Sequence, residues 1–494
     1  MSDAPTRRVD RRRALAALAG IAGLAAGCMG GDTDGPSQTA TEAASRTATT
    51  TEARTATATE TRTEPGTATE TATRTETEMA TRTETETATR TETETPTETE
   101  APTETEAGTE TEATTGPETD GPATTNRTTA GTGTAAGNDG WPMFGYDARN
   151  TGHAPDERPP TGSVGEQWSF DAGGAVQSAP TVVDGTVFVS AGSPGFDGKK
   201  ALYALDAASG EEQWAIETED PPSSPAVADG TVFVARNDSF DTRVQALDAA
   251  TGDVQWTFEH ESGVQAGLTV ADGTVFVPQA NAGVTALDAA SGEEQWASEA
   301  VSGVQTTPAV ADGTVVVGSI DRNVTALDAA SGEQQWSAGT DDQVTSSPAI
   351  IDGTVYVGSG ISIGAGGVYA LDAASGDEQW HADLETGVSV SPAVADGRVF
   401  VGTFDLKLYA LDGASGDEQW VYGMSGSATD SSPVVAGGLV VFGTINDTLH
   451  AVDATSGERA WIFEVGDDVD SSPAVVDGTV FVGSNDATVY AIGS

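Results

Sequence analysis

The side chains that could perform chemistry are few in this chain and lie far apart. The four histidines are too widely separated for a local metal-ligand motif, and they stand at His153, His260, His381 and His450. No phosphate-binding Gly-x-x-x-x-Gly-Lys motif occurs. The sole cysteine, Cys28, excludes an intrachain disulfide framework. The sequence therefore predicts no catalytic residue and no metal site.

Repeated Asp-Gly pairs are the remaining pattern that could suggest chemistry, because Asp-rich loops bind calcium. The pairs lack the Asp-x-Asp-x-Asp-Gly run of a calcium loop. Asp312-Gly313 instead separates two apolar runs, TTPAVA and TVVVGS, and a Gly at such a point tolerates positive φ. These pairs are therefore predicted to be two-residue hairpin turns.

The elements that would position any site belong to a repeat. The frame Ala-x-Asp-x-x-x-Gly-x-x-x-Trp recurs about every 40 residues, which is typical of repeat architectures. Its seven copies span 204–214, 246–256, 286–296, 326–336, 370–380, 410–420 and 451–461. Each unit holds four short strand patterns of about the usual length, separated by turn residues. Four-stranded units repeated in this way favour a β-propeller over a β-solenoid, whose repeats are usually shorter.

The residues of the frame have predicted structural roles. Each Asp can accept hydrogen bonds from the N–H groups of the following turn, and each Trp can wedge between neighbouring blades and donate one N–H. The docking tryptophans are Trp168, Trp214, Trp256, Trp296, Trp336, Trp380, Trp420 and Trp461. The turn aspartates are Asp206, Asp248, Asp288, Asp328, Asp372, Asp412 and Asp453.

The number of units predicts eight blades and a particular closure. Eight first strands and eight third strands can be counted, but Trp168 has no Ala-x-Asp before it and Ala491-Ile492 has no Trp after it. These two half-units are predicted to complete one blade, so that an N-terminal strand closes the last blade. The expected fold is an all-β, eight-bladed propeller of four-stranded antiparallel blades. Closure of the ring would remove its exposed strand edges.

The frame resembles the tryptophan-docking motif of β-propellers of the pyrroloquinoline quinone (PQQ) type, over roughly residues 141–494. This resemblance implies the propeller fold, but the family includes both quinoprotein dehydrogenases and outer-membrane assembly lipoproteins. A dehydrogenase of this family would have an adjacent cysteine pair, calcium ligands and a catalytic Asp around the quinone. The pair is absent here, and no residue matches the calcium ligands. The assembly-lipoprotein branch is therefore the nearer resemblance.

Residues 1–28 are predicted to be a twin-arginine-type lipoprotein signal. Five arginines between Arg7 and Arg13 precede an apolar run, 14–26, that is too short to span a membrane. Ala25-Ala26-Gly27-Cys28 resembles a lipobox, although Ala replaces the usual Leu at its first position. Cys28 is thus the predicted lipid anchor, and an ordinary cleaved signal is the alternative.

Residues 29–140 form a low-complexity segment of Thr, Glu and Ala with too few apolar residues for a core. We predict a disordered stalk. Residues 141–160 are predicted to pack on the propeller through Trp141, Phe144 and Tyr146, and residues 161–494 form the propeller itself. Four Asn-x-Ser/Thr sequons are candidate glycosylation sites, at Asn126, Asn237, Asn323 and Asn446.

The charge of the chain indicates its environment. The net charge is −54, and residues 141–494 alone hold 52 acidic and 10 basic residues. A folded domain this acidic suits molar salt, where the Debye length falls to about 3 Å. We therefore predict a protein of an extremely halophilic archaeon. The acidic surface also argues against nucleic-acid binding, which needs basic surface.

These observations predict a non-enzymatic lipoprotein on the outer face of the cell membrane, held there by the lipid anchor alone. A monomeric propeller would bind surface proteins or polysaccharide and need no cofactor. The alternative is a PQQ-dependent dehydrogenase with an atypical site. Longer predicted turns at 192–200, 235–243 and 358–367 mark a candidate binding surface if they share one face.

Overall fold

The structure is a computed structural model. It describes residues 43–63, 69–89, 140–192, 198–238, 241–260, 262–264, 266–362, 364–384, 386–424 and 431–494. The described residues form strands and turns, and no helix among them has the length and apolar character needed to cross a membrane. The chain divides into two compact units, residues 1–124 and 125–494.

The first unit contains one two-stranded antiparallel ribbon. Strands β1 (Ala43–Thr63) and β2 (Thr69–Thr89) pair over their whole length, from Ala43 with Thr89 to Thr63 with Thr69. A lone two-stranded ribbon is at best marginally stable in water, and Met79 is the one large apolar residue of these two strands. The ribbon therefore supplies no hydrophobic core, as its composition predicts.

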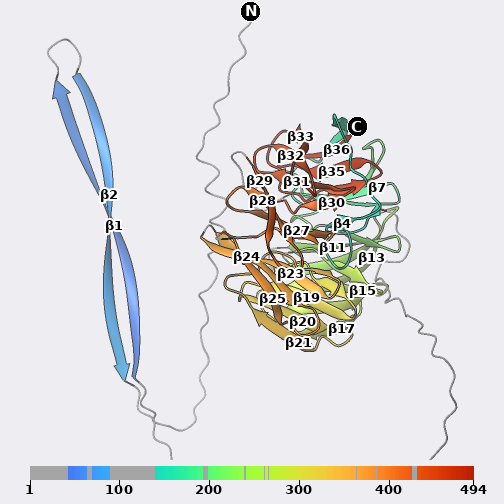
Figure 1. Cartoon of the computed structure of the whole chain (residues 1–494), viewed down its shortest axis with the longest axis horizontal. Helices are drawn as coiled ribbons and strands as arrows, with labels where there is room; N and C mark the ends of the chain where they lie inside the picture. Colours follow the sequence, from blue (N-terminus) through green and yellow to red (C-terminus); the bar gives the residue numbers. More distant parts are fainter. Residues whose placement is uncertain are drawn as a thin grey trace, which may run out of the picture. The chain divides into compact units, whose positions relative to one another are not determined.

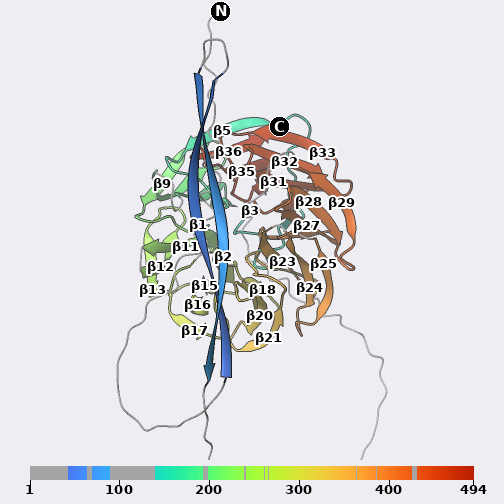
Figure 2. The same ribbon diagram turned by 90° about the vertical axis from the view of Figure 1, so that its left-hand side faces the viewer.

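The second unit is an eight-bladed β-propeller, as the repeat predicts. Figure 2 shows the blades arranged in a ring around a central axis, and Figure 1 shows the same disc turned by 90°. Each blade has four antiparallel strands, in chain order from the axis outward except in blade 8, whose outer strand comes from the start of the propeller. The innermost strands are β6 (Thr181–Val183), β10 (Ala226–Ala228), β14 (Thr269–Ala271), β18 (Ala309–Ala311), β22 (Ala349–Ile351), β26 (Ala393–Ala395), β30 (Val434–Ala436) and β34 (Ala474–Val476).

The second and third strands form the buried middle of each blade, because neighbouring blades cover both of their faces. The second strands are β7 (Thr186–Ala191), β11 (Thr231–Asp238), β15 (Thr274–Gln279), β19 (Thr314–Ser319), β23 (Thr354–Ser362), β27 (Arg398–Thr403), β31 (Leu439–Thr444) and β35 (Thr479–Gly483). The third strands are β8 (Ala201–Asp206), β12 (Asp241–Asp248), β16 (Gly283–Asp288), β20 (Asn323–Asp328), β24 (Ala365–Asp372), β28 (Lys407–Asp412), β32 (Thr448–Asp453) and β36 (Thr488–Gly493).

The outer strands carry the docking tryptophans and alternate between exposed and partly buried residues. They are β9 (Glu212–Glu217), β13 (Val254–His260), β17 (Glu294–Ser298), β21 (Gln334–Gly339), β25 (Glu378–Asp383), β29 (Glu418–Gly423), β33 (Arg459–Glu464) and β5 (Gly165–Asp171). We number the blades 1 to 8 from β6–β9 to β34–β36. Strand β5 completes blade 8 by pairing with β36, with Trp168 opposite Ala491. The predicted closure of the ring is confirmed.

The Asp-Gly pairs are two-residue turns between the first and second strands. In blade 4 both turn residues have positive φ, 48° at Asp312 and 76° at Gly313, which is the geometry of the tight hairpin turn that fits twisted strands. We call the end of the disc that carries these turns the Asp-Gly face. The opposite end, which carries the turns between second and third strands and the linkers between blades, is the linker face.

The predicted long turns lie on the linker face, since all three join a second strand to a third. Two of them are not long turns, however, and that prediction was wrong. In blade 2 the ladder continues through the pairs Arg236–Arg243 and Asp238–Asp241, and in blade 5 it reaches Ser362–Ala365. Continued cross-strand pairing therefore lengthens these hairpins in place of loops.

Candidate functional site

The tryptophans join each blade to the next by one hydrogen bond. Seven indole Nε1 groups donate to a backbone carbonyl of the following blade and the eighth, of Trp461, donates to Pro160, all at 2.8–3.2 Å. The pairs are Trp168–Ala207, Trp214–Ala249, Trp256–Ala289, Trp296–Ala329, Trp336–Ala373, Trp380–Gly413, Trp420–Ala454 and Trp461–Pro160. Seven of these carbonyls lie directly after the Asp of the frame, so the frame forms the docking site for its neighbour.

The Asp of the frame holds the docking turn in place. Asp206 Oδ1 accepts hydrogen bonds from the N–H groups of Ala208 (3.2 Å) and Ser209 (2.9 Å) and from the Ser209 hydroxyl (2.8 Å). The same contacts recur at Asp328 and Asp412. Hydrogen bonds from Ser209, first from its hydroxyl, lower the pKa of Asp206, because they favour the carboxylate.

The Gly of the frame lets the indole approach the backbone. Gly332 has a φ of 71°, and a Cβ atom there would lie 2.5 Å from Cε3 of Trp296. On its other side the indole contacts its own blade, where the ring of Phe276 lies 6.0 Å from that of Trp296. The indole is therefore held between an aromatic ring and a bare backbone, which explains why the frame requires glycine.

The eighth joint is built differently, because blade 8 ends without a frame. Trp461 donates to Pro160 O at 2.8 Å, so residues 155–160, which we call the strap, replace the missing docking turn. The strap also explains an exception in blade 7, where Gly437 stands in place of the turn Asp. A Cβ at Gly437 would lie 3.0 Å from Cδ of Pro159 and 3.1 Å from Cα of Arg158.

The axis of the propeller is filled by residues 140–154, which we call the plug. Its first residues form β3 (Gly140–Trp141), which pairs with β6, and its last residues form β4 (His153–Ala154), which pairs in parallel with β30. Five inner-strand N–H groups also donate to plug carbonyls: Val227 to Pro142 (2.8 Å), Val310 to Ala148 (2.6 Å), Ile350 to Arg149 (2.9 Å), Val394 to Thr151 (2.8 Å) and Val435 to Gly152 (2.7 Å). The label of β3 lies near the centre of the ring in Figure 2.

Side chains of the plug reinforce these backbone contacts. Trp141 is 1% exposed and packs edge-on against Tyr146, with 5.1 Å between ring centroids. Asn150 Nδ2 lies 3.1–3.2 Å from the carbonyls of Thr307, Pro308 and Pro348. The lead-in segment was predicted to pack on the propeller, and the structure places it through the centre.

Around the plug, hydroxyl groups connect consecutive blades. The backbone N–H before each inner-strand Pro or its equivalent donates to a hydroxyl of the next blade: Ala179 to Ser224 (3.1 Å), Gly267 to Thr307 (3.0 Å), Thr307 to Ser347 (3.0 Å), Ser347 to Ser391 (2.9 Å), Ser391 to Ser432 (3.0 Å) and Ser432 to Ser472 (3.0 Å). We call this arrangement the serine belt. At two joints the acceptor position holds Gly267 or Ala179, which have no hydroxyl.

The axis does not fit a quinone cofactor at the level of the serine belt. The cavity left between the plug and the belt, lined by Phe144, Asn150 and Ser432 among others, has a volume of about 10 Å³. That volume holds at most one water molecule. A planar, multi-ring group cannot enter there, and the chain's one cysteine lies outside the described residues.

A larger hollow, which we call the axial cavity, opens on the Asp-Gly face beside the plug. Its volume is about 810 Å³, and it spans blades 3, 4 and 5. Lining residues include Arg149, Ala311, Ile351 and the turn aspartates of all three blades, Asp272, Asp312 and Asp352. This size lies within the range of ligand pockets.

The one cation of the axial cavity is already paired. Arg149 donates from Nε (2.9 Å) and Nη2 (2.7 Å) to Oδ2 of Asp147. Asp147 is 9% exposed and also accepts hydrogen bonds from the N–H and hydroxyl of Thr151. The unpaired charge around the cavity is therefore that of its aspartates.

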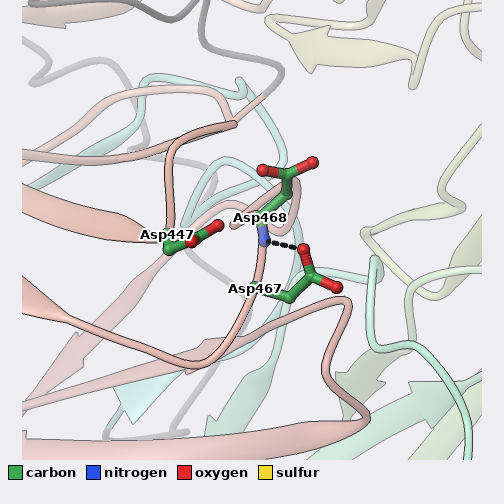
Figure 3. A group of neighbouring side chains, drawn as sticks. All are labelled: Asp447, Asp467 and Asp468. Atoms are coloured by element: carbon green, nitrogen blue, oxygen red, sulfur yellow. Dashed lines mark hydrogen bonds between the residues drawn. The ribbon is translucent and has the colours of Figure 1, made fainter. Parts of the chain in front are cut away.

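On the linker face, Asp447, Asp467 and Asp468 form an acidic cluster (Figure 3). Asp447 belongs to the turn between β31 and β32, and the other two to the linker after β33. Partial burial and the nearby carboxylate of Asp467 raise the pKa of Asp447. The Asp468 N–H donates to Asp467 Oδ1 at 3.0 Å. Sequence reasoning missed this group, because its members come from different strands.

The remaining predicted positions are scattered. Asn323 and Asn446 lie at the linker face, where Asn446 is exposed. Asn237 is in β11 near the same face. Cys28 and Asn126 fall outside the described residues, so their predicted modifications stay predictions. The histidines are not brought together: His450 is buried against Phe442, and His381 stacks on Tyr369 in another blade.

Comparison with known proteins identifies the relatives of this propeller. A family profile described as outer membrane protein assembly factor BamB matches residues 158–240, 240–363, 341–445 and 425–494. The crystal structure of BamB from Moraxella catarrhalis has a TM-score of 0.56 and 17% identity, and the match covers 67% of this chain and 98% of that chain. No curated protein sequence matches this chain significantly.

Enzymes share the fold equally well. A quinohemoprotein alcohol dehydrogenase from Pseudomonas putida HK5 has a TM-score of 0.57 and 17% identity, and the match covers 72% of this chain and 80% of that chain. A europium-containing methanol dehydrogenase has a TM-score of 0.58 and 15% identity, with 72% and 98% covered. At such identities these structures support the propeller fold and leave the activity open.

Proposed function

This chain belongs to the family described as outer membrane protein assembly factor BamB, and on that premise we propose that its propeller is a non-enzymatic scaffold that binds other proteins at the cell surface. The observation that carries the proposal is the filled axis. A propeller that acts on a small molecule can use its central channel, whereas here the plug occupies that channel at the serine belt and leaves about 10 Å³. The axial cavity of about 810 Å³ opens beside it.

The chemistry of the described residues supports binding over catalysis. The axial cavity holds exposed aspartates and one Arg149–Asp147 ion pair, and His450 is sequestered between blades. A general base would have to reach a substrate from a concave site. Most aspartates with a lowered pKa, such as Asp206, are engaged in docking turns, and Asp405 is engaged by Lys407 and Thr403.

The placement of the protein rests on its sequence. We propose export through the signal at 1–28, lipidation of Cys28 and a stalk over 29–140 that holds the propeller off the membrane. Mass spectrometry of the purified protein tests this: a thioether-linked glycerol diether lipid on Cys28 is expected, and Cys28→Ser should release the protein into the medium. An unmodified Cys28 in membrane-bound protein would contradict the proposed anchor.

The competing function is a PQQ-dependent oxidoreductase with an atypical site, because dehydrogenases share this propeller fold. Titration of pyrroloquinoline quinone into the full chain in molar salt separates the two. We expect no saturable binding and no dye reduction with alcohols or sugars. Saturable quinone binding coupled to dye reduction would overturn the scaffold proposal.

A further inference from the structure

The serine belt is interrupted at the joint between blade 8 and blade 1. The last link before this joint runs from the Ser432 N–H to the Ser472 hydroxyl at 3.0 Å. The Ser472 N–H would donate next to a hydroxyl of blade 1, but that position holds Ala179, which has none. Ser472 is 9% exposed, and its N–H has no hydrogen-bond partner among the described residues. Because a buried N–H without a partner costs free energy, an acceptor is needed at this joint.

The plug leaves an unpaired acceptor at the same level of the axis. Asn150 Nδ2 lies 3.1–3.2 Å from three carbonyls of blades 4 and 5, and only an NH2 group can donate to carbonyls. These contacts fix the orientation of the amide, so that its oxygen lies on the other side. Asn150 is 2% exposed, and its Oδ1 atom is buried with no hydrogen-bond partner among the described residues. A donor is therefore needed beside Oδ1.

One cavity adjoins both unpaired groups. It is the cavity of about 10 Å³ between the plug and the belt, which we call the belt cavity, and Asn150, Ala179 and Ser472 all line it. Ser432 lines it as well, and its hydroxyl, which accepts the Ser391 N–H, can still donate its own hydrogen. The volume corresponds to the space that one water molecule needs. The belt cavity is thus a site for a ligand no larger than water.

The two unpaired groups select the chemical class of that ligand. The Ser472 N–H needs an acceptor, whereas Asn150 Oδ1 needs a donor or a cation. A metal cation would bind Oδ1 but would be repelled by the N–H dipole, and an anion would do the reverse. Water donates and accepts at once, and a buried water typically makes about three hydrogen bonds to polar groups that would otherwise be unsatisfied.

We propose that the belt cavity binds one structural water molecule, which takes the place of the hydroxyl that blade 1 lacks. This water accepts from the Ser472 N–H and donates to Asn150 Oδ1. Asn150 then holds blades 4 and 5 through its NH2 group and blade 8, on the opposite side of the ring, through the water. A single amide thereby connects the plug to both halves of the propeller. The inference does not depend on the proposed scaffold function.

Crystallography of the full chain, grown from molar salt, tests the proposal. In the parent we expect one ordered water at about 2.7–3.2 Å from both Ser472 N and Asn150 Oδ1. In Ala179→Ser the new hydroxyl should accept from the Ser472 N–H, as serine does in blades 5 to 8, and the water should be lost. A belt cavity without a water in the parent would overturn the proposal, as would a water that persists in Ala179→Ser. A peak that contacts Oδ1 but not Ser472 N would indicate a cation and would also overturn it.

A matched pair of variants measures the hydrogen bond in solution. Ala179→Thr and Ala179→Val introduce side chains of the same shape, and each should displace the water. Threonine already serves this position in blade 4, where Thr307 accepts the Gly267 N–H at 3.0 Å. Only the threonine hydroxyl can replace the bond to the Ser472 N–H, so Ala179→Val should melt a few degrees lower than Ala179→Thr.

Equal melting temperatures of the two variants would show that the Ser472 N–H needs no acceptor in the belt cavity, and would overturn the proposal. Neither experiment involves partner binding or quinone turnover. A negative result here would therefore leave the scaffold function untouched, and a failure of the scaffold function would leave the water site untouched.

Discussion

Blades 6 and 7 and blades 3 to 5 are copies of one repeat, yet they present different surfaces at the axis. In the first group, which we call the covered arc, the plug and the strap bury the inner strands, as Ala436 shows at 0% exposed. In the second, the open arc, the same position is half-exposed and borders a cavity of about 810 Å³. The repeat differs between the two arcs at few inner-strand positions, such as Gly437 in blade 7. A short non-repeated segment therefore creates the difference, and asymmetry in a symmetric scaffold marks where binding can occur.

A substitution in the plug should have the largest effect on stability. Trp141→Ala deletes a fully buried indole from the plug, and we expect it to lower the free energy of unfolding by about 4 kcal/mol. Ile351→Ala in the open arc should cost about 1 kcal/mol, because this side chain is only half-buried. Denaturant unfolding in molar salt measures both. Equal losses would remove the distinction between the arcs.

The second-largest effect should be a loss of stability at low pH that comes from the covered arc. His450 in blade 7 is buried beside Tyr422, and burial lowers its pKa from 6.5 to about 4. Below pH 6.5 the His450 imidazole is protonated in the unfolded chain but stays neutral in the folded chain until the pH approaches 4. Stability is therefore complete above that pH and should fall by about 3 kcal/mol as the pH approaches 4. Blade 4 has Thr325 at the same position.

The control for this prediction is His450→Asn, which cannot titrate. Its stability should be lower than that of the parent at pH 7, but it should change much less between pH 6.5 and 4. Thermal unfolding at matched salt gives both curves. A parallel decline in the parent and the variant would assign the acid sensitivity to other groups.

The joints between blades should be the same in both arcs. Gly332→Ala and Gly457→Ala each place a methyl group against an indole, at 2.5 Å from Trp296 and 2.8 Å from Trp420. Each should cost about 2–3 kcal/mol, from positive φ and steric overlap together. Gly313→Ala has a similar φ but open space around it, so it should cost only about 1 kcal/mol. Unequal costs at the two joints would extend the difference beyond the axis.

The smallest effect should come from exchanging the turn residues of the two arcs. Gly437→Asp restores the usual Asp-Gly turn in blade 7 but crowds Pro159 and Arg158, and we expect a loss of about 1 kcal/mol. Asp312→Gly in blade 4 should change stability by less than about 0.5 kcal/mol, because nothing lies over that turn. Melting temperatures of the two variants compare them directly. An unchanged melting temperature of the Gly437→Asp variant would contradict the close contact between the strap and the turn of blade 7.

The fold was predictable because the residues that determine it lie close together in the sequence and recur in every unit. Each copy of the frame contains, within eleven residues, a docking turn for the preceding blade, such as Asp206 to Gly210, and a tryptophan that docks on the following blade, such as Trp214. The closure also followed from two incomplete units, around Trp168 and Ala491. Local spacing, turn chemistry and alternation determine such features without knowledge of distant contacts.

The candidate site was less predictable, because its contacts join residues far apart in the chain. Arg149 lies more than 100 residues before Asp272 and Asp312, and the plug satisfies inner strands of six blades. The aromatic residues of 141–160 indicated only that this segment packs on the propeller. One signal was present: Gly437 interrupts the Asp-Gly series, and the reason becomes visible only once Pro159 lies over it.

The strand that completes blade 8 also determines when the disc can be finished during synthesis. Strand β5 is translated early, but its partner β36, Thr488–Gly493, follows only after all the other blades. Until those residues have left the ribosome, β5 and β35 each have an unpaired edge that could pair with other chains. A chaperone that covers these edges would therefore have to act until β36 has emerged.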